Sequence, residues 1–125
     1  MNILIVHAHP EPLSFTTALK DQAVRVLEQQ GHHVEVSDLY AMNFNPVASR
    51  EDFTTLKNEE YLNYALEQRH ASQQKLLSTD IQSEIEKVQK ADLLILNFPM
   101  YWTSIPAILK GWIDRVFVSG IFYGG

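Results

Sequence analysis

Two short stretches gather side chains that could bind a charged, planar ligand. "HAHPEPLSFTT" (7–17) carries two histidines, a serine and two threonines ahead of an expected helix start. Such polar groups, together with the free N–H groups of a first helical turn, favour an anion-binding site. "NFPMYWTSI" (97–105) holds three aromatic rings and a methionine on an expected loop. An anion site facing an aromatic wall suits a phosphorylated planar cofactor.

Other chemistries are less well supported by these residues. The GxGxxG and GxxxxGK[ST] phosphate-binding fingerprints are absent. His7 and His9 face the same side of an extended segment and could form a metal pair, but no third ligand has a helpful spacing. The simpler interpretation of each histidine is a structural residue whose hydrogen bonds are satisfied at a strand edge. Ser14 can equally be only a helix cap. We find no paired carboxylates and no Ser/His/Asp order.

The aromatic residues of 98–117 divide between core and site. Trp112 and Phe117 lie on an expected helix, where burial in the core is the simpler interpretation. Tyr101 and Trp102 lie on a loop, where we favour a binding site. Charged residues near these segments, and a pair in the middle of the chain, are expected to be solvated: Asp114, Arg115, Glu59 and Glu60.

Composition narrows the class of protein. The 125 residues are 46% hydrophobic and 20% charged, which is typical of a globular domain. A net charge of −5 argues against an electrostatic nucleic-acid binder. With no cysteine, disulfides, thiolate metal sites and a cysteine nucleophile are excluded. The apolar run at the N-terminus is too short to span a membrane and lacks a basic region before it, so we expect a cytoplasmic protein without membrane insertion.

Strands and helices are expected to alternate. Apolar, β-branched runs predict strands near 2–8, 32–39 and 91–99. Apolar residues at helical spacing (Phe15, Leu19, Ala23, Val26) predict a helix between Ser14 and Gly31. A second helix is expected to begin at a Thr79–Gln82 capping box, and a last one around Pro106.

This order predicts an α/β fold with a doubly wound parallel sheet and right-handed crossovers. We expect a single domain over 1–125, with a partly helical excursion at 40–78. Only three strands are expected, and the chain ends in "FYGG" without covering the next sheet edge. Either residues follow Gly125, or the protein is a truncated form that relies on a partner.

The expected sheet indicates where a ligand should bind. Ligands of open parallel sheets lie beyond the carboxyl ends of the strands, where the strand order reverses. In the common order 2-1-3-4-5 this point lies between the first and third strands. The two loops concerned are 7–17 and 97–105, the stretches already singled out.

Three longer stretches, "LIVHAHPEPLSF" (4–15), "SDLYAMNFNPVASREDF" (37–53) and "FPMYWTSIPAILKGWIDRVF" (98–117), carry a family resemblance. In order and spacing they resemble the NAD(P)H:quinone oxidoreductases, or DT-diaphorases, of the flavodoxin-like superfamily. The resemblance implies a tightly bound FAD, reduced by NADH or NADPH and reoxidised by a quinone in a two-electron, ping-pong reaction. It also implies a homodimer with active sites at the subunit interface.

The same resemblance assigns roles to individual residues. His9, Phe15 and Thr16 match positions near the FAD phosphates, although many members have Asn where Thr16 stands. Asn63 falls where an adenine-side Gln often lies. The isoalloxazine loop corresponds to Pro99, Met100, Tyr101, Trp102 and Thr103, and Tyr101 departs from the Gln common there. The resemblance also implies two catalytic-site residues. Trp102 would form part of the platform for the nicotinamide and the quinone, and Tyr123 would reach toward the partner subunit's pocket.

Several alternatives stay open at this point. Related proteins serve as ancillary, regulatory subunits of potassium-efflux antiporters, and a truncated, flavin-free paralogue could act by dimerising alone. FMN is the less favoured flavin. The family's loop after the fourth strand would follow residue 125, so a polypeptide that ended at Gly125 is expected to lose FAD affinity and quinone reduction.

Overall fold

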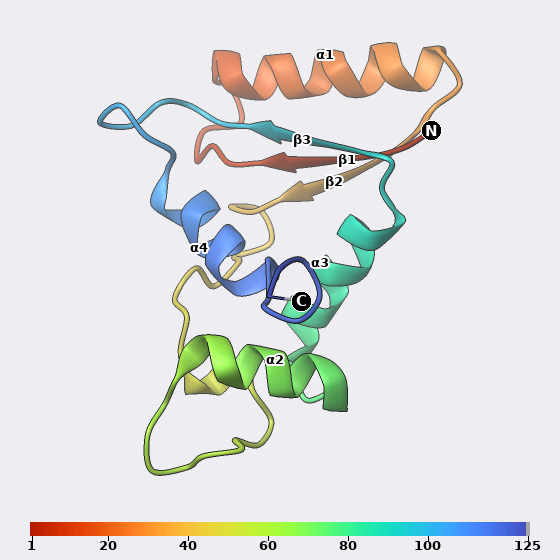
Figure 1. Cartoon of the computed structure of the whole chain (residues 1–125). Helices are drawn as coiled ribbons and strands as arrows, with labels where there is room; N and C mark the ends of the chain where they lie inside the picture. Colours follow the sequence, from red (N-terminus) through yellow and green to blue (C-terminus); the bar gives the residue numbers. More distant parts are fainter. Residues whose placement is uncertain (125) are drawn as a thin grey trace.

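Three parallel strands form the sheet of the computed structural model, which describes residues 1–124. β1 (Asn2–His7) lies between β2 (His33–Asp38) and β3 (Leu93–Asn97), so the strand order is β2-β1-β3. The register pairs His7 with Asp38 on one side and with Asn97 on the other. The predicted strands and their parallel arrangement are confirmed. All three strands end at the same edge of the sheet (Figure 1).

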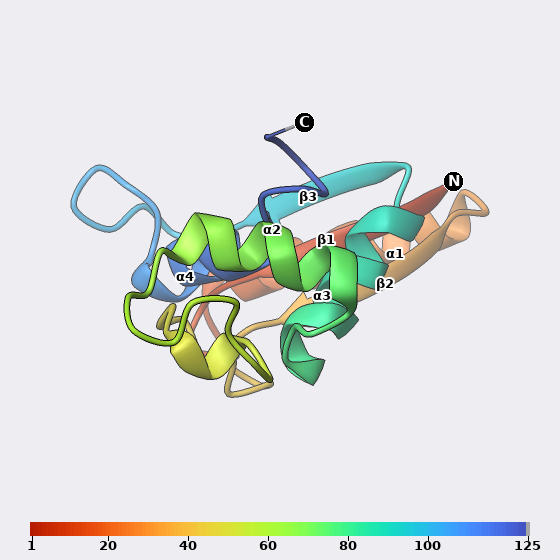
Figure 2. The ribbon, with the colours of Figure 1, turned by 60° about the horizontal axis from the view of Figure 1, so that its bottom comes forward.

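Helices cover both faces of this sheet, as the doubly wound prediction requires. α1 (Phe15–Gln29) lies on one face, and α3 (Thr79–Lys90) and α4 (Ala107–Val116) lie on the other (Figure 1). A short 3-10 turn, η1 (Arg50–Asp52), and α2 (Tyr64–Gln74) form a further layer outside α3 and α4 (Figure 2).

The ends of α1 follow from its sequence. Ser14 Oγ accepts a hydrogen bond from Thr17 N at 3.0 Å, which makes Ser14 the expected N-cap. Gly31, with φ of +89°, takes the left-handed conformation that ends the helix. The buried face of α1 differs from the predicted apolar face, since Phe15 is 78% exposed and Thr17 is buried.

The start of α3 differs from the prediction. The helix begins at Thr79, with Ser78 as N-cap and no side-chain cap bond, so the Thr79–Gln82 capping box is wrong. With this N-cap the third helical residue is Ile81, which cannot return a hydrogen bond as a Glu or Gln would. A capping box forms instead at η1, between Ser49 and Asp52.

The core lies between the sheet and the α3–α4 layer. Trp112 is completely buried there, as predicted, and its indole N–H donates to Glu84 Oε1 at 3.0 Å. Phe117 is half-buried and packs edge-on against Trp112. Gly111 allows α4 to approach the 40–78 segment, because a Cβ at this position would overlap the backbone of Pro46.

The prediction that Arg115 is solvated is wrong, because its side chain is only 2% exposed. Nε and Nη2 donate to Asp52 Oδ1 at 3.1 and 2.8 Å, and Nη1 donates to Asp80 Oδ2 and to the Asn45 carbonyl, both at 2.8 Å. Asp52 is itself buried and accepts from the Tyr64 hydroxyl. These partners come from distant parts of the sequence, so helical spacing alone gave no sign of the cluster.

Two groups of this cluster, Asp80 and Tyr64, have shifted pKa values. Burial acts to raise the pKa of Asp80, but hydrogen bonds from Arg115 and Ser78 hold it below its ordinary value. Burial and the hydrogen bond to Asp52 raise the pKa of Tyr64. The cluster therefore fixes the 40–78 segment to α3 and α4 through one buried guanidinium.

None of the helices described within residues 1–124 has the length and apolar character needed to cross a bilayer.

Candidate functional site

The two predicted loops lie side by side at the carboxyl edge of the sheet. β1 and β3 remain paired to their ends, and beyond them Ala8 N donates to Asn97 O at 3.0 Å. From this edge the 7–17 loop runs to the N-terminus of α1, and the 97–105 loop projects outward before α4 (Figure 1). Neighbouring strands thus bring residues about ninety positions apart in the sequence into one site.

The projecting loop is closed by a tight turn. Tyr101 N donates to Ser104 O at 2.9 Å, and Ser104 N donates back to Tyr101 O at 3.0 Å. The two central residues, Trp102 and Thr103, have φ of +49° and +60°. Positive φ at both positions is the signature of a type I′ turn, and it is unfavourable for a β-branched residue such as Thr103. The strained turn holds the Trp102 side chain 97% exposed.

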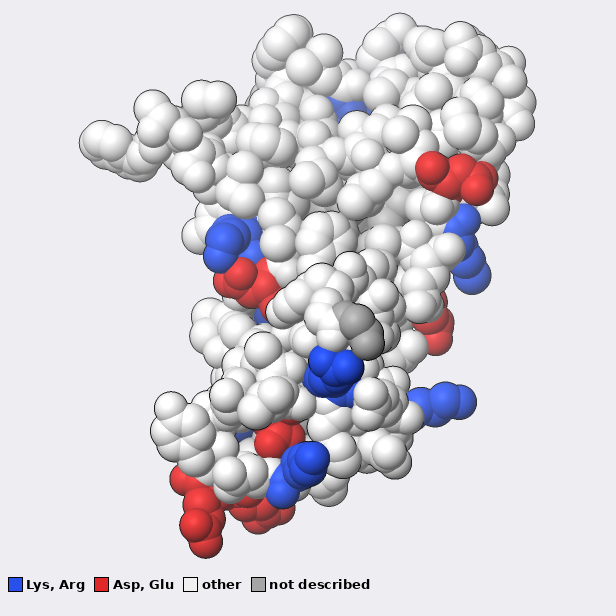
Figure 3. Space-filling view, viewed as in Figure 1, with Lys and Arg blue, Asp and Glu red and all other residues white. Residues whose placement is uncertain are grey.

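The surface of this loop is apolar and uncharged. Met100 is 73% exposed, and no Lys, Arg, Asp or Glu occurs between residues 98 and 109. The same projection is free of charged atoms in the space-filling view (Figure 3). The described residues give no hydrogen-bond acceptor to the N–H groups of Met100, Trp102 and Thr103. The loop therefore offers a flat ring an apolar surface next to unpaired backbone donors.

The N-terminus of α1 supplies the second half of the site. Ser14 caps the amide of Thr17, but the amides of Phe15 and Thr16 have no acceptor among the described residues. Phe15 projects into solvent beside them, and Thr16 is half-buried. Free N–H groups at a helix N-terminus, aided by the helix dipole, favour an anion such as a phosphate.

His9 lies in the connection between β1 and α1. Its Nδ1 accepts from Glu11 N at 3.0 Å, so its Nε2 remains as a donor toward a ligand. His9 also lines a hollow of about 460 Å³ on the β2 side of the loop, next to Lys20, Asp38 and Tyr40. The described residues include no group of three or more His, Cys, Asp or Glu side chains that could hold a metal ion.

His7, Asn97 and Thr17 form a cluster that sequence reasoning did not find. His7 is 1% exposed; its Nδ1 lies 3.0 Å from Asn97 Nδ2, and its Nε2 lies 3.3 Å from Thr17 Oγ1. Burial lowers the pKa of His7, although the charge of nearby Asp38 acts in the opposite direction. The sequence signal for this cluster was the position of the two residues, because His7 and Asn97 both end strands at the same edge of the sheet.

Two predicted residues lie away from this edge. Asn63 caps α2 and accepts from Leu66 N at 3.2 Å. Tyr123 follows α4 and lines a hollow with Tyr64, Gln68 and Phe117. The loops at the carboxyl edge thus carry His9, Phe15, Thr16 and Pro99–Thr103, whereas Asn63 lies at the start of α2 and Tyr123 lies beside α2 and α4.

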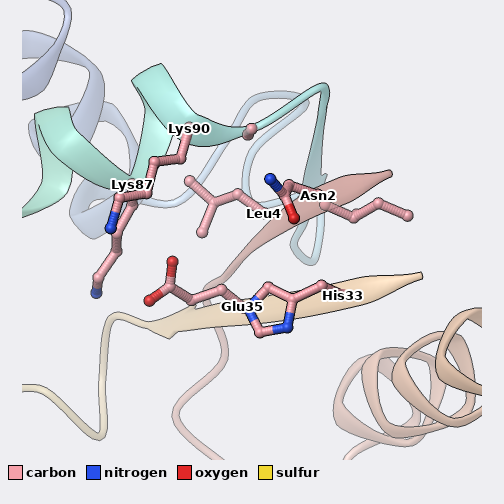
Figure 4. A pocket seen from close by; sticks show the side chains of 8 residues that line it. Asn2, Leu4, His33, Glu35, Lys87 and Lys90 are labelled. Carbon is pink, nitrogen blue, oxygen red and sulfur yellow. The ribbon is translucent and has the colours of Figure 1, made fainter. Parts of the chain in front are cut away.

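A separate cavity of about 290 Å³ opens at the opposite, amino end of the strands. Its walls include Asn2, His33 and Glu35 from the sheet and Lys87 and Lys90 from α3 (Figure 4). The Lys87 ammonium pairs with Glu84 at 2.7 Å. The cavity is therefore distinct from the loops that carry the predicted site.

Comparison with known proteins places the chain in a family. The model of a family described as having a flavodoxin-like fold matches residues 1–125. The human protein named ribosyldihydronicotinamide dehydrogenase [quinone] is 52% identical over 122 residues, which are 97% of this chain and 53% of that protein. The chain spans about half the length of the curated relatives it matches.

Solved structures give the same fold. A Klebsiella pneumoniae protein designated a candidate quinone reductase is 45% identical, with a TM-score of 0.96, and the match covers 99% of this chain and 48% of that one. An NAD(P)H:quinone oxidoreductase from Methanothermobacter marburgensis is 37% identical, with a TM-score of 0.82, and the match covers 100% of this chain and 57% of that one.

Proposed function

The chain belongs to the flavodoxin-like fold family, and from this membership and its site we propose that the protein reduces quinones with NAD(P)H through a bound FAD. The relatives named as quinone dehydrogenases and quinone oxidoreductases support this proposal. The single observation that carries it is the meeting, at one sheet edge, of a helix N-terminus with unpaired amides and an apolar loop with unpaired amides. Donors on both sides fit a ligand that is anionic at one end and a flat ring at the other.

The anionic end fits the first turn of α1. The amides of Phe15 and Thr16 would donate to phosphate oxygens, and His9 Nε2 would add a donor from the neighbouring loop. Lys20, one turn further along α1, is ion-paired with Asp21 at 2.6 Å and contributes little additional positive charge. Backbone amides and the helix dipole are therefore the main source of anion affinity.

The flat end fits residues 99–103. The turn fixes the backbone of Trp102 and Thr103, so their N–H groups can meet ring carbonyls and nitrogens without rearranging. A bound flavin would supply the redox chemistry, a two-electron hydride transfer from NAD(P)H to the quinone. The chain's own residues orient the ring, and the apolar side chains of Met100 and Trp102 exclude water from its face.

Trp102 and Tyr123 have more specific proposed roles. At 97% exposure, the Trp102 indole is free to stack on a nicotinamide or quinone ring. Tyr123 is 55% exposed and could complete the pocket of a second subunit. The homodimer and the cytoplasmic location expected from the sequence remain predictions, which sedimentation and cell fractionation would test.

The activity can be tested directly with the protein purified at its native length. With added FAD and NADH or NADPH, we expect reduction of a soluble naphthoquinone, with initial-rate patterns of a ping-pong reaction. Trp102→Ala should raise the KM for the quinone about 5- to 150-fold, because stacking of a flat ring on an aromatic side chain is worth about 1–3 kcal/mol. Val47→Ala, at an exposed apolar residue outside the site, should leave the kinetics unchanged. Binding of FAD without any quinone turnover would contradict the proposed activity.

A further inference from the structure

His7 occupies a point where three elements of the site meet. It is the last residue of β1, it pairs in register with the last residue of β3, and its ring lies against the first turn of α1. Its side chain is almost completely buried, so each ring nitrogen needs a hydrogen-bond partner. None of the roles proposed above uses this ring.

The hydrogen bonds define which ring nitrogen carries the proton. Asn97 Nδ2 donates one hydrogen to the Thr16 carbonyl at 2.9 Å, which fixes the orientation of the amide. Its second hydrogen is directed at His7 Nδ1, 3.0 Å away, so Nδ1 must be an acceptor. His7 is therefore neutral with its hydrogen on Nε2.

The other side of the ring agrees with this tautomer. The Thr17 hydroxyl donates to the Glu11 carbonyl at 3.0 Å, and it accepts from Ser14 Oγ at 3.0 Å. One lone pair of Thr17 Oγ1 remains, and the His7 Nε2–H is directed at it from 3.3 Å. The chain Asn97–His7–Thr17–Glu11 is thus fully satisfied, with every donor matched to an acceptor.

We propose that His7 is a positioning residue that holds the α1 N-terminus and the 97–105 loop in register, and that it does so only as a neutral imidazole. A proton on Nδ1 would face the Asn97 amide hydrogens, so donor would meet donor and the link to β3 would break. Because Asn97 also holds the Thr16 carbonyl, the disturbance reaches the first turn of α1. The two halves of the site would then lose their fixed separation.

The charged groups around His7 act on its pKa in opposite directions. Asp38 at the end of β2 and Asp21 on α1 favour the imidazolium, whereas Lys20 on α1 and His9 in the connecting loop disfavour it. The neighbour on β3, Asn97, carries no charge. Burial has the largest effect, and it lowers the pKa of His7 below the ordinary 6.5.

A first test needs no flavin. In the full chain labelled with ¹³C and ¹⁵N at histidine, we expect His7 to show the Nε2–H tautomer at pH 7.5 and to titrate below pH 6.5. The amide signals of Thr16 and of residues 98–104 should shift with the same midpoint as His7. An Nδ1–H tautomer, or a titration that moves the signals of only one loop, would overturn the proposal.

Variants separate positioning from simple packing. Gln at position 7 keeps a donor and an acceptor but cannot take up a proton, whereas Leu loses both bonds and leaves the Asn97 and Thr17 groups unpaired. Thus His7→Gln should remove the coupled shifts while keeping the high-pH loop signals, and His7→Leu should alter those signals at every pH. His33→Gln, at an exposed histidine at the other end of the sheet, is the matched control and should change neither loop.

A second test rests on the proposed function and uses FAD as the probe. Below the pKa of His7, the dissociation constant for FAD should rise by up to about tenfold per pH unit, because one proton must leave before binding. The pH dependence should disappear in His7→Gln and persist in His33→Gln. An unchanged slope in His7→Gln overturns the positioning role while the flavin proposal stands. Failure of the wild-type protein to bind FAD at pH 7.5 instead overturns the proposed function, and the flavin-free titration then decides the role of His7 alone.

Discussion

Replacing Arg115 by Met should destabilise the protein strongly while leaving its site residues in place. Methionine retains most of the aliphatic stem but removes both hydrogen bonds to Asp52 and the bonds to Asp80 and Asn45. Asp52 is 1% exposed and would keep only the Tyr64 hydroxyl and the Ser49 amide as donors. A buried carboxylate would therefore lose its cation.

The magnitude follows from how each partner is exposed. Removing one member of a buried ion pair costs about 3–5 kcal/mol, because the remaining charge is uncompensated. Asp80 has a side chain that is 46% exposed, so losing its bond to Arg115 adds at most about 1 kcal/mol. We expect a total near 4 kcal/mol, which is a large share of the about 5–15 kcal/mol available to a typical domain.

Urea unfolding followed by far-UV circular dichroism measures this loss. Lys110→Met is the matched control, since it removes an exposed ion pair with Asp114 from the same helix and should cost less than about 0.5 kcal/mol. Adding Asp52→Asn to Arg115→Met should restore at least about 1 kcal/mol, because it removes the uncompensated charge. A cost below about 1 kcal/mol for Arg115→Met, or no recovery in the double variant, would refute this reasoning.

Three further predictions concern packing, acid stability and the exposed loop. Gly111→Ala should lower the melting temperature and cost about 1–3 kcal/mol, because the new Cβ would overlap the Pro46 backbone; an unchanged melting temperature would contradict the close approach. Burial acts to raise the pKa of Glu67, but hydrogen bonds from Lys57 N and Asn58 N hold it below 4.5. Its stabilisation is thus present above about pH 4.5 and lost as the pH falls through the folded-state pKa, so Glu67→Gln should flatten the acid limb of stability against pH. Trp102→Ala should change the free energy of unfolding by less than about 0.5 kcal/mol, since the ring is 97% exposed, and a larger loss would mean that the indole packs in solution.

Local sequence signals predicted the sheet and the edge at which the two candidate loops meet. Runs such as Ile3–Val6 are apolar at consecutive positions, which only a strand covered on both faces accommodates, and these residues are all buried. Ser14 and Gly31 bound α1 for reasons that act within one helical turn. Once the strands are parallel, their loops must meet at one edge, so 7–17 and 97–105 followed from the order of elements.

The missed features depend on contacts between distant residues. Arg115 lies next to Asp114 on α4, and both positions look equally suited to solvent in the sequence. The 40–78 segment, folded over α4, supplies Asp52 and the Asn45 carbonyl to Arg115, and α3 supplies Asp80. In the same way, His7 acquires its role from Asn97, ninety residues away, through a register that no local pattern specifies.

Equilibrium titration of the protein, purified at its native length, with FAD tests the proposed flavin site most directly, with flavin fluorescence and the visible spectrum as readouts. We expect saturable quenching at pH 7.5, weakened in a Phe15→Pro variant, which removes an α1 amide where proline is tolerated at the first helical position. A folded protein that leaves the flavin spectrum and fluorescence unchanged would contradict the central claim that loops 7–17 and 97–105 together hold the cofactor.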